Sequence, residues 1–428
     1  MKRDYASTVV TELVVMGCSL LVYRIAARRF GEAGFGEYAI ARRTISLIQL
    51  PLLLGLSLSV TRHVAVVVGT SSSRRDEIGG YLWVTIATGG AAALLFAVSC
   101  VPFASRYAQL AFGDSRYAYL LGPMGLVVAG LSLHGLIYGY FRGNAQMPEA
   151  NALQFVNNAV IPLAVFWRAP SPQRAFLLLG IGVLAIAGLA TAVALIRVGI
   201  PRMPLHQWRG YARRLLGYGV IRVPGEFAWT ALLALPVNLY AHAVGVTQAG
   251  YLAFAVAMLS AFGGLFAPLG HILLPAIGRM MAGQEYAAAR RHVWRLMIGC
   301  TGMAMVGTVF VEALAGFGIR AFLAPSYWPA AAFVRILFIC AIPYVTYIVL
   351  RAVLDAVYVR PWNTIHLVAA IAVEIGVMSL FPRLRLACLP IAIGLLGTLT
   401  AYRTIIALRG DRDRAEAEPL AEPVKVGK

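Results

Sequence analysis

Ionisable side chains interrupt the apolar stretches of this sequence at many points, and most of them are arginines. A charged side chain inside a membrane span is costly, so its presence suggests a functional role. A guanidinium stays protonated and can donate two parallel hydrogen bonds to phosphate oxygens, and histidine can exchange a proton near neutral pH. The residues that we consider candidates for binding a substrate are Arg24, Arg42, Arg62, His134, Arg142, Arg222, Glu226, His271, Arg279, Arg335 and Arg351.

Each candidate also has a simpler structural explanation. Arg222 and Glu226 are four residues apart, so a local ion pair on one helix is the simplest alternative. The two histidines, His134 and His271, can be packing residues with hydrogen bonds instead of proton relays. Arginines near the end of a span can extend to the membrane interface. That alternative fits Arg24, Arg42, Arg142, Arg279 and Arg351.

The composition places these residues in a membrane protein. The chain has 428 residues, of which 60% are hydrophobic and 13% are charged, whereas soluble domains carry about 25% charged residues. Long apolar runs such as "FLLLGIGVLAIAGLATAVALI" match the roughly 20 residues that a transmembrane helix requires. The runs do not alternate as β-barrel strands do. The sequence therefore predicts an all-α polytopic membrane protein.

The apolar runs divide the chain into two halves of similar size. We expect a N-terminal lobe of six helices over 1–198, a cytoplasmic connecting loop over 199–216, a C-terminal lobe of six helices over 217–408, and a polar cytoplasmic tail over 409–428. The twelve predicted spans are 8–27, 44–68, 78–101, 118–141, 151–168, 176–197, 217–240, 248–275, 293–318, 331–352, 363–381 and 386–407. The first span is expected to stay in the protein and not to be a cleaved signal peptide.

The basic character of the chain is explained by its membrane location. The net charge is +19 and comes almost entirely from arginines, most of which flank the spans and can face anionic lipid. We therefore expect no nucleic acid partner. The arginines are most frequent at the two termini and in the even-numbered loops, which places both termini in the cytoplasm. The five cysteines show no metal-ligand spacing, and we expect neither a metal nor another cofactor.

A weak internal repeat supports two parallel six-helix units. At an offset of 214 residues, Gly31 aligns with Gly245 and Gly36 with Gly250. Parallel repeats of this kind are related by an axis along the membrane normal. The fold class that we predict is about twelve transmembrane helices in two lobes around a central cavity.

The glycine-rich stretch "FGEAGFGEYAIARR" (30–43) resembles a nucleotide-binding loop only superficially. It follows an apolar helix, lacks the Lys-Ser/Thr pair of a phosphate-binding loop, and does not have the GxGxxG order. We interpret it as a tight turn between two helices, in which Gly31, Gly34 and Gly36 supply unusual backbone angles. The second half would repeat that turn with Gly245 and Gly250.

Two stretches resemble a known family. "RRFGEAGFGEYAIARRTISLIQLPLLLGLSLSVTRHVA" (28–65) and "GYFRGNAQMPEANALQFVNNAVIPL" (139–163) are similar to the first two helices and to the helix 4 to 5 junction of bacterial polysaccharide flippases. These belong to the multidrug/oligosaccharidyl-lipid/polysaccharide exporter (MOP) superfamily. This chain departs from the commonest pattern in its short loops and its near lack of lysine. In the resembled family, helices 1, 2, 4, 7, 8 and 10 line the central cavity.

The resemblance implies a transporter of the bacterial inner membrane and not an enzyme. It implies translocation of an undecaprenyl-pyrophosphate-linked oligosaccharide for surface polysaccharide such as lipopolysaccharide O-antigen or exopolysaccharide. The expected partners are this lipid-linked oligosaccharide and membrane lipids, with a glycan polymerase and glycosyltransferases as further candidates. Arginines would serve such a cavity because they bind pyrophosphate.

Other functions stay open at this stage. A drug or cation extruder of the same superfamily would need an acid-rich cavity, whereas the candidates here are mainly arginines. A membrane glycan polymerase would need a large polar loop, but the longest external loop, "PFASRYAQLAFGDSRYA", contains one acid and no histidine. A non-transporting component of an assembly complex would leave the charges within the spans unexplained.

Overall fold

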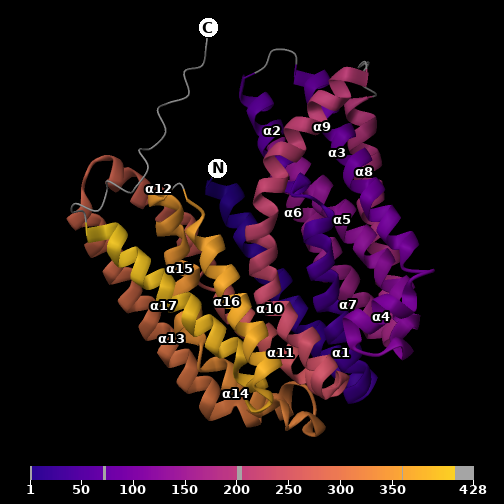
Figure 1. Ribbon diagram of the computed structural model, residues 1–428. Helices are drawn as coiled ribbons and strands as arrows, with labels where there is room; N and C mark the ends of the chain where they lie inside the picture. The colour runs from indigo at the N-terminus through magenta and orange to yellow at the C-terminus, as the bar shows by residue number, and fades with distance from the viewer. Residues whose placement is uncertain (1, 71–73, 200–204, 359, 410–428) are drawn as a thin grey trace. The chain divides into compact units, whose positions relative to one another are not determined.

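The structure is a computed structural model that describes residues 2–70, 74–199, 205–358 and 360–409 (Figure 1). In this part of the chain, all regular structure is helical and no strand is present. The residues group into two compact units, the first formed by Met1–Phe254 with Arg320–Tyr327 and the second by Ala255–Ile319 with Trp328–Lys428. The predicted tail lies outside the described residues from 410 onward.

The first unit contains ten complete helices among its described residues, and the helix that follows crosses into the second unit. The ten are α1 (Lys2–Leu52), α2 (Leu56–Thr70), α3 (Arg74–Ser99), α4 (Ala104–Phe112), α5 (Leu121–Gly143), α6 (Met147–Phe155), α7 (Ile161–Arg168), α8 (Pro172–Val198), α9 (Leu205–Gly219) and α10 (Val223–Val244). The crossing helix is α11 (Val246–Gly264). Helix α9 occupies much of the segment 199–216 that was expected to be a connecting loop.

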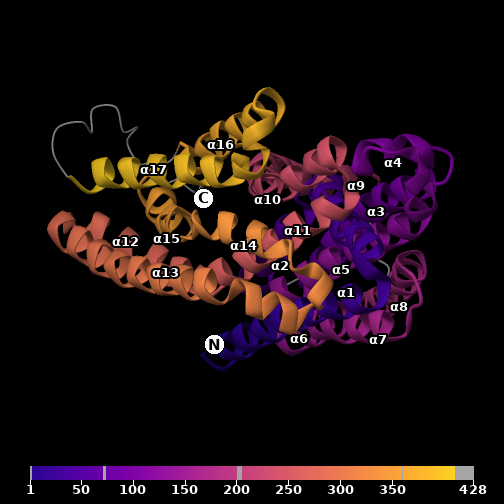
Figure 2. The same cartoon turned by 90° about the horizontal axis from the view of Figure 1, so that it is seen from below.

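The second unit holds the remaining helices. They are α12 (Ala267–Ala282), α13 (Tyr286–Phe322, which ends in the first unit), α14 (Ala330–Phe338), α15 (Ala341–Val357), α16 (Trp362–Leu380) and α17 (Cys388–Arg409). Helix α15 lies between α12 and α17 (Figure 2). A Cβ atom on Gly397 of α17 would lie 2.7 Å from Pro343 Cβ of α15, so glycine is needed for this close packing.

The helices confirm an all-α polytopic membrane protein. Nine helices of the described chain are long and apolar enough to cross a membrane, or ten if α14 and α15, which are bent by 50°, form one span. Two features account for much of the difference from the twelve predicted spans. Helix α1 continues through a kink and joins the first predicted span to the start of the second. The predicted span at 151–168 is interrupted by a π-helical turn, Val156–Val160.

The glycine-rich stretch is a kink within α1. Gly31 has φ +66° and Gly245, its counterpart in the repeat, has φ +117°, both in the region that favours glycine. The predicted unusual angles at Gly34 and Gly36 are wrong, because neither residue has a positive φ. Gly36 serves close packing instead, since a Cβ atom on Gly250 would lie 2.7 Å from Gly36 Cα. The two repeats thus contact each other at equivalent glycines.

The second predicted span is broken, which the sequence analysis did not anticipate. Helix α1 ends at Leu52, and Leu54 (φ +49°) and Gly55 (φ +68°) adopt left-handed backbone conformations before α2 begins. A Cβ atom on Gly55 would collide with the backbone of Gly219 at the end of α9. The break therefore brings α2 directly against α9, which is where the candidate site lies.

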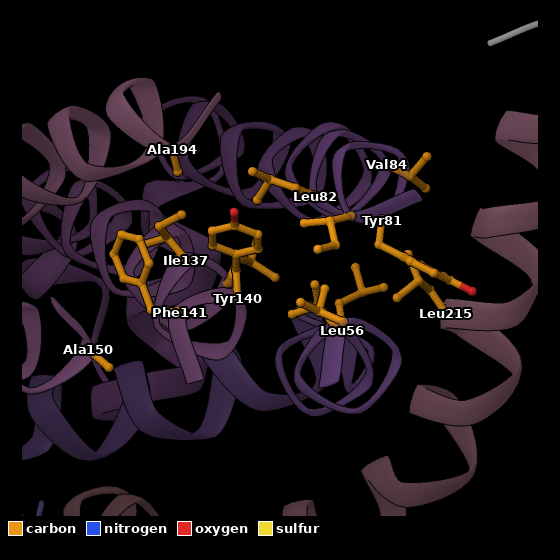
Figure 3. Packing of buried hydrophobic residues seen from close by; sticks show 14 of the residues in the cluster. Leu56, Tyr81, Leu82, Val84, Ile137, Tyr140, Phe141, Ala150, Ala194 and Leu215 are labelled. Atoms are coloured by element: carbon orange, nitrogen blue, oxygen red, sulfur yellow. The ribbon is translucent and has the colours of Figure 1, made fainter. Parts of the chain in front are cut away.

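A buried apolar cluster holds the first unit together. Helices α3, α5 and α8 lie side by side in both views (Figures 1 and 2). Ala194 points toward Ile137 and Phe141, and Tyr81 extends to the side of Leu215 (Figure 3). Because a fully buried apolar side chain contributes about 2 kcal/mol, this cluster fixes the helices that carry the polar residues described next.

Candidate functional site

Helices α2 and α9 meet through their backbones and one buried hydroxyl. Ser59 Oγ on α2 donates to the carbonyl oxygen of Leu215 on α9 at 2.8 Å. Glycines at positions 55 and 219 allow the two backbones to approach each other. This contact sets the distance between the side chains that follow Ser59 on α2 and those that follow Leu215 on α9.

Two of the predicted arginines lie over the same aromatic ring. The guanidinium carbon of Arg62 lies 4.3 Å from the ring centre of Tyr218, and that of Arg222 lies 3.8 Å from it. Arg222 Nη1 also donates to the carbonyl oxygen of Tyr218 at 3.4 Å. His63 approaches the same ring edge-on, with 5.8 Å between ring centres. We call Arg62, His63, Tyr218 and Arg222 the arginine–tyrosine cluster.

The cluster is suited to binding an anion. The side chains of Arg62 and Arg222 are exposed, and each guanidinium group lies over the ring of Tyr218. Cation–π attraction to the ring does not use the N–H donors as hydrogen bonds, and each guanidinium group has five of them. Two guanidinium groups held in this way present fixed donors to a phosphate or pyrophosphate.

An aromatic row extends the cluster. The rings of His63 and Tyr81 are 5.1 Å apart, and those of Tyr81 and Tyr211 are 4.7 Å apart. Arg214 Nη1 donates to the hydroxyl of Tyr81 at 3.5 Å. Tyrosine rings provide flat apolar surfaces and a hydroxyl that can bond to sugar hydroxyls. The row therefore combines cationic and aromatic groups next to the anion-binding arginines.

Glu226 does not neutralise this charge. Ion pairs among the described residues include Arg116–Asp114 and Arg335–Glu312, whereas Arg222 bonds to the carbonyl oxygen of Tyr218 and not to Glu226. Glu226 is exposed in the first turn of α10. The local Arg222–Glu226 ion pair that the spacing suggested is therefore not formed.

His134 lies in a different kind of site, a buried network of amides. Asn157 Nδ2 lies 3.1 Å from His134 Nδ1, and His134 Nε2 lies 3.0 Å from Gln154 Oε1. An amide nitrogen can only donate and an amide oxygen can only accept, so these contacts select a neutral imidazole with its proton on Nε2. Asn158 Nδ2, 3.3 Å from the same Nε2, then donates to Gln154 Oε1 at 3.0 Å.

The network reaches the surface at Glu12 of α1. Gln154 Nε2 donates to Glu12 Oε1 at 3.2 Å, and the Glu12 side chain is exposed. The π-helical turn Val156–Val160 contains both asparagines, and such turns are frequent at functional sites. We call Glu12, His134, Gln154, Asn157 and Asn158 the His134 network.

Arg142 lies next to this network through one tyrosine. His134 stacks on Tyr138 at 5.7 Å, and the guanidinium carbon of Arg142 lies 5.6 Å from the centre of the same ring. The Arg142 side chain is exposed, whereas His134 is 7% exposed. The structure thus brings two further predicted residues together, although they do not contact each other directly.

Arg42 and Arg24 have internal partners near the kink of α1. Arg42 donates to the hydroxyl of Tyr38 at 2.8 Å and to Ser19 Oγ at 3.1 Å, and it lies 5.1 Å from the ring centre of Tyr23. Arg24 lies 5.6 Å from the ring centre of Phe322. These contacts favour a packing role for both arginines.

The candidates of the second unit are dispersed. Arg335 on α14 pairs with Glu312 on α13 at 3.9 Å. Arg351 on α15 is half-buried, and Arg279 is exposed in the last turn of α12. His271 belongs to α12, and its side chain lies outside the described residues. Arg279, Arg335 and Arg351 thus lie on three different helices of this unit.

Several residues that connect the candidates were not identified from the sequence. Tyr218 was not among the candidates, although it precedes Arg222 by four residues, a spacing that places both on one helical face. Gln154, Asn157 and Asn158 were also missed. Three amides within five residues of an apolar run are an unusual feature that could have drawn attention to them.

Comparisons with known proteins agree with the all-helical fold. Residues 1–281 match the sequence profile of the family described as "Polysaccharide biosynthesis protein". The "Lipid III flippase" of Escherichia coli (strain K12) is 26% identical over 197 residues, which make up 45% of this chain and 46% of that protein. The protein of the same description from Shigella flexneri matches over the same extent. This chain therefore spans less than half the length of the curated relatives that it matches.

Solved structures show the same fold at low identity. The inward-facing conformation of a multidrug resistance MATE family transporter of the MOP superfamily has a TM-score of 0.72 at 11% identity, covering 93% of this chain and 94% of that one. A eukaryotic MATE transporter has a TM-score of 0.63 at 10% identity, covering 94% and 95%. These structures support the fold alone, whereas the profile match covers well over half of the sequence. The chain therefore belongs to the polysaccharide biosynthesis protein family.

Proposed function

We propose that this protein moves an undecaprenyl-pyrophosphate-linked oligosaccharide from the cytoplasmic to the outer leaflet of the bacterial inner membrane, for the synthesis of a surface polysaccharide. The single observation that carries the proposal is that Arg62 and Arg222 both lie over the ring of Tyr218. The membership of the chain in the polysaccharide biosynthesis family supports it. Both termini face the cytoplasm in this proposal.

The arginine–tyrosine cluster binds the pyrophosphate in this scheme. Carrying a multiply charged group into a low-dielectric region is very costly unless opposite charges and hydrogen-bond donors accompany it. The two guanidinium groups supply both, and the aromatic row of Tyr81 and Tyr211 offers stacking surfaces to the first sugars.

The cluster also fits alternating access between two lobes. Arg62 belongs to the lobe that we expect over 1–198 and Tyr218 and Arg222 to the lobe that we expect over 217–408, and all three lie in the first compact unit. A substrate that binds residues of both lobes changes their relative stability in the two access states, which is how binding can drive a conformational change. Energy would come from an ion gradient or from consumption of the substrate outside. In this proposal, glycosyltransferases assemble the lipid-linked oligosaccharide before this step, and a glycan polymerase uses it afterwards.

The proposal can be tested by deleting the gene and analysing lipid-linked sugars by thin-layer chromatography. We expect an undecaprenyl-linked oligosaccharide to accumulate on the cytoplasmic side, and the wild-type gene to clear it. The double variant Arg62→Ala/Arg222→Ala should insert normally and fail to clear it. Arg209→Ala is the matched control, because Arg209 is an exposed arginine of α9 outside the cluster.

Two outcomes would contradict the proposal. If the double variant cleared the lipid-linked sugar as well as the wild type, the cluster would not be the binding site. If no lipid-linked sugar accumulated and drug sensitivity rose instead, the chain would be a drug or cation extruder of the same superfamily.

A further inference from the structure

A cavity opens beside the apolar cluster of the first unit, away from the arginine–tyrosine cluster. Its volume is about 270 Å³, roughly nine times the ~30 Å³ that a water molecule occupies in the liquid. It lies where the ends of α3, α5 and α8 meet the turn between α5 and α6. The cavity is therefore large enough for the headgroup of a lipid, and no step of the proposed transport uses it.

The lining of the cavity is divided by polarity. Tyr140, Asn144, Gln146 and Arg197 supply polar groups, whereas residues of the apolar wall include Phe141, Val193 and Ala194. Tyr140, Phe141 and Ala194 appear at this edge of the cluster in Figure 3. A cavity lined by both an arginine and apolar side chains is suited to an amphipathic ligand.

The polar groups are positioned by the turn after α5. Ala145 adopts a left-handed conformation (φ +56°) in this turn, and its two sequence neighbours, Asn144 and Gln146, both line the cavity. Asn144 Nδ2 donates to the hydroxyl oxygen of Tyr140 at 3.5 Å, so the hydroxyl proton of Tyr140 can be donated to a ligand. Gln146 Oε1 is buried and accepts no hydrogen bond from the described residues, so it offers an acceptor that is costly to leave without a donor.

Neighbouring residues place this cavity at the depth of lipid headgroups. Arg197 lies in the last turn of α8, and Gly199 ends that helix. Trp83 Nε1 on α3 donates to the carbonyl oxygen of Gly199 at 2.9 Å. Tryptophan side chains concentrate at the membrane–water interface, and arginines at helix ends extend into the headgroup layer.

We propose that this cavity binds an anionic glycerophospholipid whose headgroup carries hydroxyl groups, as in phosphatidylglycerol. Arg197 and the hydroxyl of Tyr140 bind the lipid phosphate, and a headgroup hydroxyl donates to Gln146 Oε1. The acyl chain contacts Val193 and Ala194. Phosphatidylcholine has the same phosphate but no hydroxyl donor, and its trimethylammonium group is unfavourable next to Arg197. This inference does not depend on which substrate the protein transports.

The test is lipid binding to the purified full-length protein, measured by native mass spectrometry. We expect phosphatidylglycerol to be retained about tenfold more than phosphatidylcholine, since a buried acceptor such as Gln146 Oε1 that is left without a donor costs roughly that factor. Arg197→Ala should weaken the retention of phosphatidylglycerol and reduce the preference, because it removes a phosphate donor and the charge that disfavours the trimethylammonium group. Arg174→Ala is the matched control, because Arg174 is an exposed arginine at the opposite end of α8, and it should leave the preference intact.

Further arms keep the test decisive. If Arg197→Ala does not yield folded protein, Gln146→Leu and Ala194→Phe test the headgroup and the acyl-chain parts of the same cavity. Gln146→Leu should reduce the preference, and Ala194→Phe should reduce the retention of both lipids. Equal retention of the two lipids by the wild type, an unchanged preference in Gln146→Leu, or unchanged retention in Ala194→Phe overturns the proposal. It is also overturned if glycerol phosphate, which lacks acyl chains, competes as strongly as the whole lipid. Displacement of phosphatidylglycerol by the lipid-linked sugar would overturn it too, by assigning the cavity to the transport path.

Discussion

The arginine–tyrosine cluster and the His134 network are both polar sites within the first unit, but they satisfy their polar groups in opposite ways. Arg62 and Arg222 are exposed and lie over the ring of Tyr218. His134, by contrast, is buried and has hydrogen-bond partners at both ring nitrogens. The first site keeps hydrogen-bonding capacity for a ligand, whereas the second uses its capacity internally.

This difference indicates different roles for residues that looked alike in the sequence. An exposed cation over a ring contributes little to folding, because its charge stays solvated. A buried imidazole between amides contributes to folding mainly through the cost of leaving its partners without hydrogen bonds. Binding is therefore expected to depend on the cluster, and stability on the network.

The largest expected effect is on stability, from His134→Leu. The leucine leaves the amides of Gln154 and Asn157 without their ring partner, and we expect a loss of roughly 3 kcal/mol in the free energy of unfolding. Thermal unfolding of the detergent-solubilised protein measures it. His134→Gln, which can still donate and accept, should recover part of the loss. If Arg62→Ala/Arg222→Ala destabilised the protein as much as His134→Leu, the distinction between the two sites would be wrong.

An intermediate effect is expected at Tyr218, on transport and not on stability. Tyr218→Leu removes the ring on which both arginines lie, and we expect clearance of the lipid-linked sugar to fall about tenfold, corresponding to ~1.4 kcal/mol of cation–π interaction. Tyr218→Phe keeps the ring face and should clear the sugar at nearly the wild-type rate. Equal defects in the two variants would show that the hydroxyl, and not the ring, is what the site requires.

The smallest effect is expected at the edge of the network. Asn158 is half-buried and donates to Gln154 Oε1. When the Asn158 side chain is removed, Gln154 Oε1 still accepts the hydrogen bond from His134 Nε2. Asn158→Ala should therefore cost about 1 kcal/mol of stability in the same unfolding experiment. Asn157→Ala is the comparison, and it should cost more because Asn157 is buried and is the partner of His134 Nδ1. Equal losses would mean that burial does not set the cost.

The helical fold and its glycine turn could be predicted from the sequence with useful accuracy. Apolar runs of sufficient length predict spanning helices, because the membrane leaves the backbone few alternatives. The repeat correctly paired Gly31 with Gly245, and both have positive φ. Gly36 was predicted to supply an unusual backbone angle, but its role is close packing against the chain around Gly250. That role depends on a partner far away in the sequence.

The candidate site could be predicted only in part. Residue types were sufficient to select Arg62, Arg222 and His134, because charges and imidazoles in apolar runs are rare. Whether such a residue binds a ligand or packs internally depends on its neighbours in space. Arg42 was selected on the same grounds as Arg62, yet its donors are used by Tyr38 and Ser19.

The sequence by itself determined that this protein is a helical membrane protein with an excess of arginine and a repeated glycine turn. These properties follow from local composition and from the thickness and apolar interior of the lipid bilayer in which the helices must be stable. The tertiary structure alone decided that Arg62 and Arg222 share the ring of Tyr218. That decision rests on the break at Leu54 and Gly55 and on its contact with Gly219, since steric fit between distant backbones is not encoded in any single stretch of sequence.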